Sequence, residues 1–75
     1  MTRSMGYLSI SRVKGLEQFL KAPLTAEELG AILWPGSRMA MVNARAVVRE
    51  LFVGEYIEYA GSTGLIFKAT PKAAA

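Results

Sequence analysis

Residues 24–33 read LTAEELGAIL, and the local chemistry of this stretch predicts where a helix begins. The Thr25 hydroxyl can accept a hydrogen bond from the Glu28 amide, while the Glu28 carboxylate can accept one from the Thr25 amide. This capping box predicts a short helix over 26–33, and the sequence WPG at 34–36 ends it because proline cannot continue a helix. The inner face of this helix is expected to hold Leu29, Ile32 and Leu33.

Apolar residues at helical spacing predict a further helix on each side of this one. The upstream helix covers 12–21 with Ser11 as its N-cap. Its apolar face holds Val13, Leu16, Phe19 and Leu20. The downstream helix covers 38–53, with Ser37 as its N-cap and Gly54 at its C-terminal end. Its buried face is expected to hold Met41, Ala44, Val48, Leu51 and Phe52.

The remaining residues predict a hairpin and two less regular ends. Residues 55–60 and 65–70 alternate apolar and polar side chains, as strands do, and the glycine-flanked segment 61–64 supplies the turn. Residues 1–11 are expected to form an N-terminal arm or a short strand, and residues 71–75 a frayed tail. The fold class is therefore α+β, with three helices followed by a C-terminal β-hairpin.

Winged-helix domains have the same order of elements: a helix, a short capped helix, a turn, a longer helix and a terminal hairpin. On these elements, residues 12–70 resemble the winged-helix branch of the helix-turn-helix superfamily. Gly30 takes the place of the small residue at which the first helix of such a unit packs against the recognition helix. The resemblance implies that helix 38–53 is the recognition helix and that residues 56–70 form the wing. The short chain also resembles accessory regulators of phages and mobile elements.

The length of the chain limits how much core it can build. It has 75 residues, of which 52% are hydrophobic, so we expect one domain over 1–75 with its own core. A domain of this length buries only about 60% of the surface that its unfolded chain exposes, so it is marginally stable alone. Pairing with a second copy would relieve this, as would a bound partner. We expect a symmetric homodimer, with its seam on the outer apolar residues of helix 12–21 or on the N-terminal segment.

The composition argues against several kinds of chemistry. The sequence contains no cysteine and no histidine, which rules out disulfides, thiolate or imidazole metal sites and histidine general bases. All 6 acidic residues are glutamates, so little catalytic material remains, and we expect neither an enzyme nor a metal or other cofactor. No stretch approaches the roughly 20 apolar residues of a membrane span, and no signal peptide is evident. The sequence thus predicts a cytoplasmic protein that does not enter a membrane.

The positive charge is concentrated in the predicted helix over 38–53. The net charge is +3 and the isoelectric point is about 9.6, which favours polyanionic partners. One stripe of the helix holds Arg38, Val42, Arg45 and Arg49. A recognition helix places such arginines against guanine edges in the major groove or against phosphates, which predicts binding to double-stranded DNA. The alternative is a solvated helix face that is partly neutralised by Glu50.

Other polar residues are weaker candidates for DNA contact. Asn43 could read adenine, and Ser37 could hold a phosphate at the helix start as well as cap it. The hairpin offers Ser62 and Thr63 at its tip and Lys68 on its second strand, where a phosphate contact is the most that this composition supports. The full set of expected DNA contacts is Ser37, Arg38, Val42, Asn43, Arg45, Arg49, Ser62, Thr63 and Lys68.

The large apolar side chains divide into two groups. Trp34, Tyr56 and Tyr59 are expected to belong to the core and the sheet, because a small domain needs their area. The alternative is that they form an exposed aromatic patch for a partner. Met39 and Val42 are expected on the outer side of helix 38–53, where they would contact thymine methyl groups or another protein.

Two functions remain open on the sequence. The first is a DNA-binding protein that acts as an accessory regulator in transcription or recombination. The second is a protein–protein module whose basic face docks an acidic partner, as an inhibitor or adaptor would. A salt titration distinguishes them, because neutralising phosphates makes affinity for DNA fall steeply as salt rises.

Overall fold

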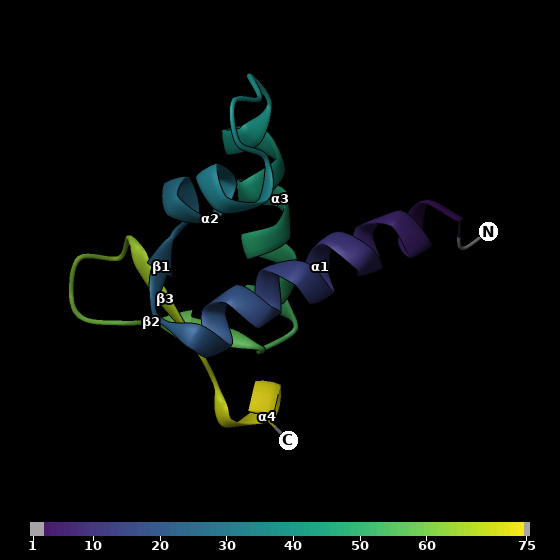
Figure 1. Ribbon diagram of the computed structural model, residues 1–75. Coiled ribbons are helices and arrows are strands. Elements are labelled where there is room, and N and C mark those ends of the chain that lie inside the picture. The colour runs from purple at the N-terminus through teal and green to yellow at the C-terminus, as the bar shows by residue number, and fades with distance from the viewer. Residues whose placement is uncertain (1–2, 75) are drawn as a thin grey trace.

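The computed structural model describes the backbone of residues 3–74 and the side chains of residues 10–73. This part of the chain is α+β, with four helices and a three-stranded antiparallel sheet (Figure 1). In chain order the elements are α1 (Arg3–Lys21), β1 (Leu24–Thr25), α2 (Ala26–Leu33), α3 (Ala40–Val53), β2 (Ile57–Tyr59), β3 (Ile66–Ala69) and α4 (Pro71–Ala74). This order and the sheet topology are compatible with a winged-helix layout.

The predicted capping box forms and starts α2 at the predicted residue. The Glu28 amide donates to the Thr25 hydroxyl over 3.1 Å, and the Thr25 amide donates to the Glu28 carboxylate over 2.8 Å. Within the helix, Leu29 is fully buried, but Ile32 is 46% exposed, so its predicted place on the inner face was wrong. Gly30 is buried against α3, where an added Cβ atom would lie 2.9 Å from the carbonyl oxygen of Ala40.

Helix α3 begins two residues later than predicted. The Ser37 hydroxyl accepts the Met39 amide over 3.0 Å, so it closes the turn before the helix and is not the N-cap. The buried face of α3 holds Ala44, Val47, Val48 and Leu51. Met41 and Phe52, which were predicted to be buried, are 37% and 39% exposed because they lie at the edge of the apolar arc that α1, α2 and the sheet cover.

The end of α3 also differs in detail from the prediction. Gly54 is the C-cap as expected, but its φ of −77° is right-handed, and the positive φ of 66° falls on Glu55. Glycine fits this position for a steric reason, because a Cβ atom there would lie 3.0 Å from the ring of Tyr56.

Helix α1 is longer than predicted. It begins at Arg3, so Ser11 lies inside the helix and the arm or strand expected over 1–11 is wrong from residue 3 onward, while residues 1–2 lie outside the described part. Phe19 is 2% exposed, whereas Val13 and Leu20 are 55% and 49% exposed, so only part of the predicted apolar face meets the core. The N-terminal half of α1 extends beyond the body of the molecule (Figure 1).

The predicted hairpin forms between β2 and β3, and the sheet gains a strand that the sequence did not predict. Tyr59 pairs with Phe67 in the hairpin register, and the Ala60 amide donates to the carbonyl of Ile66 over 2.8 Å. The two-residue strand β1 pairs with the other edge of β3, giving the order β1-β3-β2. The predicted frayed tail instead begins with α4, where Lys72 donates to the Gly54 carbonyl over 2.8 Å.

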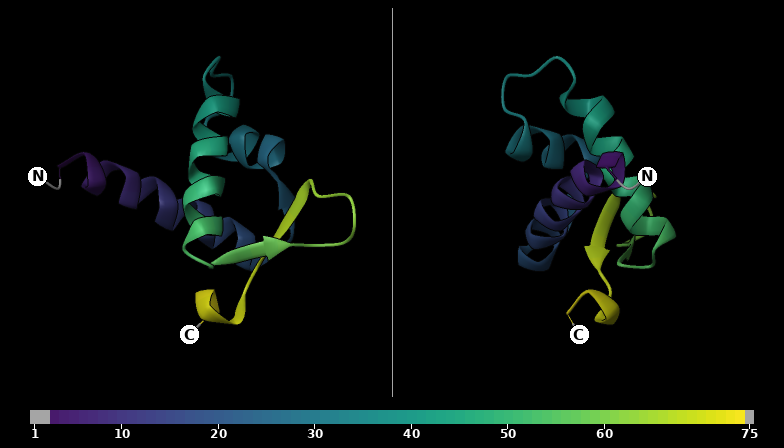
Figure 2. Two further views of the ribbon diagram at one scale, coloured as in Figure 1. Left: turned by 180° about the vertical axis from the view of Figure 1, so that it is seen from behind. Right: turned by 90° about the vertical axis from the view of Figure 1, so that its right-hand side faces the viewer.

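The core lies where α1, α2, α3 and the sheet meet. Its buried residues are Phe19, Leu29, Ala44, Val47, Val48, Leu51 and Ile57. Trp34 and Tyr56 pack against this core, as predicted, but Tyr59 is 52% exposed and does not belong to it. Met39 and Val42 are 53% and 58% exposed, as expected, although Met39 is the N-cap of α3 and does not lie within the helix. Seen from behind, the N-terminal half of α1 and the hairpin loop extend to opposite sides of α3 (Figure 2).

Candidate nucleic-acid interface

The two flanks of α3 carry different electrostatics. On the flank that faces α1, the carboxylate of Glu50 pairs with the guanidinium of Arg12 over 3.2 Å. Glu50 is the acidic residue of α3, so its charge is directed towards α1 and away from the arginine stripe. On the flank that faces the hairpin, Arg45 and Arg49 lie one turn apart and are exposed. Among the described side chains, neither arginine has a hydrogen-bond or ion-pair partner.

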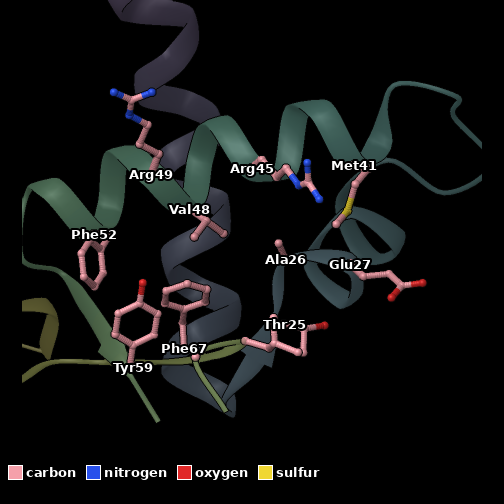
Figure 3. A pocket seen from close by; sticks show the side chains of 12 residues that line it. Thr25, Ala26, Glu27, Met41, Arg45, Val48, Arg49, Phe52, Tyr59 and Phe67 are labelled. Carbon is pink, nitrogen blue, oxygen red and sulfur yellow. The ribbon is translucent and has the colours of Figure 1, made fainter. Parts of the chain in front are cut away.

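A concave surface lies between this flank of α3 and the hairpin, and we call it the α3–hairpin groove. Its volume is about 450 Å³. The groove is lined by Thr25, Ala26, Glu27, Met41, Arg45, Val48, Arg49, Phe52, Tyr59, Gly64, Leu65 and Phe67. It therefore joins the N-terminal end of α2, one flank of α3 and the turn of the hairpin in a single surface (Figure 3).

Three aromatic rings form one end of the groove. The ring centroids of Phe52 and Tyr59 are 5.0 Å apart, those of Tyr59 and Phe67 are 5.0 Å apart, and those of Phe52 and Phe67 are 6.0 Å apart. The strand register creates this cluster, because Tyr59 and Phe67 are direct partners and project from the same face of the sheet. Phe52 reaches them from the last turn of α3.

The other end of the groove is charged and lies close to α2. Figure 3 shows Arg45 extending along α3 towards Met41, with Val48 between it and the aromatic rings. Glu27 is the acidic residue in the lining, and its carboxylate points away from the rings (Figure 3). The groove thus combines an apolar aromatic end with a charged end, where the guanidinium of Arg45 and the carboxylate of Glu27 both lie.

The structure brings together only some of the residues that the sequence singled out. Arg45 and Arg49 both line the groove. Arg38 is exposed in the turn before α3, and Val42 is exposed on the outer face of α3, beside the groove but outside its lining. Asn43 lies seven residues before Glu50, which places it on the α1-facing flank and away from the two arginines of the groove.

The hairpin candidates lie further from the basic surface. The Thr63 hydroxyl accepts the Leu65 amide over 3.2 Å, so it serves the turn, and Ser62 is exposed beside it. In the antiparallel register of the hairpin, the backbone of Lys68 lies opposite that of Glu58. Because alternate residues of a strand point to opposite faces, Lys68 projects from the sheet face opposite to Phe67 and away from the groove.

Sequence reasoning missed the aromatic end of the groove. Tyr59 was expected in the core and the sheet, Phe52 was placed on the buried face of α3, and Phe67 was given no role beyond its strand. The predicted turn would not have revealed the pairing, because a four-residue turn at 61–64 sets Tyr59 opposite Ile66, whereas the observed register sets Tyr59 opposite Phe67. The contribution of α2 could not have been found from the sequence either, since it depends on how three separate elements pack.

Neither metal ligands nor a membrane span can be identified in the described part of the chain. Residues 3–74 contain no group of three or more acidic side chains that could hold a metal ion. None of the helices described here is both long and apolar enough to cross a membrane.

No family model, curated protein or solved structure matches this chain. Its function must therefore be inferred from the geometry and charge of the groove and of α3.

Proposed function

We propose that this protein binds double-stranded DNA as a winged helix, with α3 as the recognition helix and the β2–β3 hairpin as the wing. The close contact between α2 and α3 at Gly30 supports the assignment of these helices as a helix-turn-helix pair. The pairing of β1 with β3 supports it further, because it holds the hairpin beside α3. Such a module suits an accessory regulator of transcription or recombination.

The free cationic flank of α3 carries this proposal. Arg45 and Arg49 are exposed and have no partner among the described side chains, while Glu50 is paired with Arg12 on the other flank. Arginines left free in this way can neutralise phosphates or bond bidentately to guanine without first breaking an ion pair. Arg38 extends the same charge to the start of the helix.

The hairpin contributes less charge than the helix. Its turn carries no basic residue, and Lys68 projects from the opposite face of the sheet. Contact with the DNA backbone at the wing would therefore come from the hydroxyl of Ser62 and the exposed backbone around Gly64. We infer that most of the binding free energy comes from α3.

The test is a salt titration of duplex binding for the parent protein and for the double variant Arg45→Ala/Arg49→Ala. An arginine that reads a base should cost about 1–3 kcal/mol of binding free energy when removed, and one that contacts phosphate should reduce the salt slope by about one. The free energy of unfolding should change by less than about 0.5 kcal/mol, because both side chains are exposed. The double variant Lys14→Ala/Lys21→Ala removes the same charge from the exposed face of α1 and should bind nearly as tightly as the parent.

If the two double variants lost the same duplex affinity, the loss would come from the change in net charge alone. This result would contradict the proposal that α3 is the recognition helix. Unchanged binding by a correctly folded Arg45→Ala/Arg49→Ala variant would exclude α3 as the reader.

A second function, docking of an acidic protein partner, is favoured by one specific observation. Exposed apolar side chains accompany the arginines: Val42 and Val53 on the outer face of α3 are 58% and 73% exposed, and Met39 at its N-cap is 53% exposed. Apolar groups beside free cations fit a protein surface as well as thymine methyl groups. If the parent protein binds no duplex at physiological salt, this function takes precedence. The same arginine double variant should then lose the protein partner.

A further inference from the structure

The aromatic end of the α3–hairpin groove has no evident task in binding the DNA backbone. Phe52 and Tyr59 keep 39% and 52% of their surface exposed, although each packs against the other and against Phe67. Phosphates offer nothing for these rings to bind, whereas a flat apolar group can stack on them or meet them edge to face. The exposed rings therefore point to an apolar occupant of the groove.

The groove also has the size and charge of a small-molecule site. Its volume of about 450 Å³ falls within the range of roughly 300–1,000 Å³ that is typical of small-ligand clefts. At its other end Arg45 has no partner among the described residues, and Arg49 lies one turn further along the same flank. An apolar surface with a free guanidinium at one end matches a molecule that carries rings and an acid group.

We propose that the α3–hairpin groove binds a small ring-bearing organic anion, such as an aromatic carboxylate or sulfonate. Its rings lie against Phe52, Tyr59 and Phe67, and its acid group bonds to Arg45. A small molecule fits this groove better than a segment of a partner protein, because Phe52 and Arg45 lie only about two helical turns apart on α3. The ligand site is independent of the proposed DNA binding.

Occupation of the groove has a consequence that does depend on the proposed function. If α3 binds DNA, the organic anion and the phosphates compete for Arg45, so the bound ligand lowers affinity for duplex. The protein would then release DNA in response to a small acidic metabolite, without any change of fold.

The experiment compares two fluorescent probes of nearly the same ring structure. 1-Anilinonaphthalene-8-sulfonate carries an acid group, and N-phenyl-1-naphthylamine is its uncharged counterpart. Calorimetry and fluorescence titration on the intact protein should show one molecule of the sulfonate bound per chain. Its affinity should exceed that of the neutral probe by about tenfold, the value expected for one charge-assisted hydrogen bond at a partly exposed site.

Four variants separate the two ends of the groove from the rest of the surface. Arg45→Gln should weaken sulfonate binding about tenfold and leave the neutral probe unaffected. Arg38→Gln makes the same change of charge outside the groove and should alter neither probe. Tyr59→Thr removes the ring, introduces a β-branched residue that suits a strand, and should weaken both probes. Val53→Thr removes apolar surface elsewhere on α3 and should weaken neither.

Several results would overturn the ligand site. These are equal affinity for the two probes, equal effects of Arg45→Gln and Arg38→Gln, or no binding of either probe. Sulfonate affinity that falls as protein concentration rises would identify a second copy of the chain as the occupant, which also overturns the proposal. If Tyr59→Thr does not fold, the comparison of Arg45→Gln with Arg38→Gln still tests the ligand site, because both arginines are exposed and neither variant should disturb folding.

Failure of the ligand site and failure of DNA binding can be told apart. Probe binding with no duplex binding would contradict only the proposed function, and duplex binding with no probe binding only the ligand site. If both bind, saturating sulfonate should displace the duplex from the parent protein, and undiminished duplex binding would contradict the competition.

Discussion

The side of α3 that faces α1 and α2 is closed, and the side that faces the hairpin is open. Leu51 and Phe52 are neighbours in sequence and both are large and apolar, yet Leu51 is fully buried and Phe52 is 39% exposed. On the closed side the approach is so tight that an added Cβ atom at Gly15 would lie 2.8 Å from Val47. On the open side the hairpin does not fully cover α3, and a groove lies between them. The apolar residues on the closed side of α3 thus form part of the core, whereas those on the open side line the groove.

The charges follow the same division. Glu50 on the closed side is tied to Arg12, and the two side chains are 32% and 34% exposed. Arg45 and Arg49 on the open side are left without partners among the described residues. A helix can therefore be basic towards a ligand even though it also carries an acid, provided that the acid is engaged by another element.

The largest effect should come from emptying the closed side. We expect Leu51→Ala to lower the free energy of unfolding by about 2–5 kcal/mol, because it leaves a cavity at a fully buried site. Val53→Ala removes a side chain that is 73% exposed and should change stability by less than about 0.5 kcal/mol. Urea unfolding followed by circular dichroism measures both. Similar midpoints for the two variants would mean that the two sides of α3 are not packed differently.

A smaller effect should come from overfilling the closed side. Gly30→Ala places a methyl group against the Ala40 carbonyl, and such overpacking costs about 1–3 kcal/mol. About 1 kcal/mol of this loss should be regained, since alanine favours helix over glycine. Gly15→Ala meets a side-chain methyl group of Val47 rather than backbone, so a small shift of that side chain relieves the contact and the variant should be less destabilising. A thermal melt that ranks Gly15→Ala as the worse variant would contradict the close backbone contact between α2 and α3.

The smallest effect concerns the paired charge. Glu50→Gln removes an ion pair whose members are about one-third exposed, so we expect a loss of less than about 1 kcal/mol in unfolding free energy, decreasing as salt rises. Arg49→Gln should leave stability unchanged at every salt concentration, because Arg49 has no partner among the described residues. Chemical denaturation at low and high salt tests the difference. An equal and salt-dependent loss in Arg49→Gln would show that this arginine is paired after all.

The features that the sequence predicted well depend on contacts within a few residues. The capping box links Thr25 to Glu28, and it located the start of α2 correctly because both partners lie in the same turn. The hairpin was located by its glycines, whose positive φ values at Gly61 and Gly64 show why that residue is needed there. The arginines of the groove were placed correctly on an exposed flank, since the apolar arc of α3 determines which side faces inward.

The features that were missed depend on packing between distant parts of the chain. Strand β1 has two residues, and what defines it is its pairing with Ile66 and Phe67, which no local pattern reveals. The periodicity of α3 showed an apolar arc but not how much of it its neighbours cover, so Met41 and Phe52 were misplaced. At the end of the chain, residues 71–75 were predicted to be a frayed tail, although Pro71 suits the first position of a helix.

Strand β3 is hydrogen-bonded along both edges, to β2 on one side and to β1 on the other. Thr25 is at once a residue of β1 and the N-cap of α2, so the two residues of β1 join the hairpin to α2. Separation of β1 from β3 would remove the strand pairing that holds Thr25 in the extended conformation (φ −85°, ψ 164°) of the N-cap. We therefore expect the hairpin and the start of α2 to unfold locally together, and not the hairpin alone. A molecule that clamps the hairpin would raise the free energy of local unfolding at the start of α2 as well.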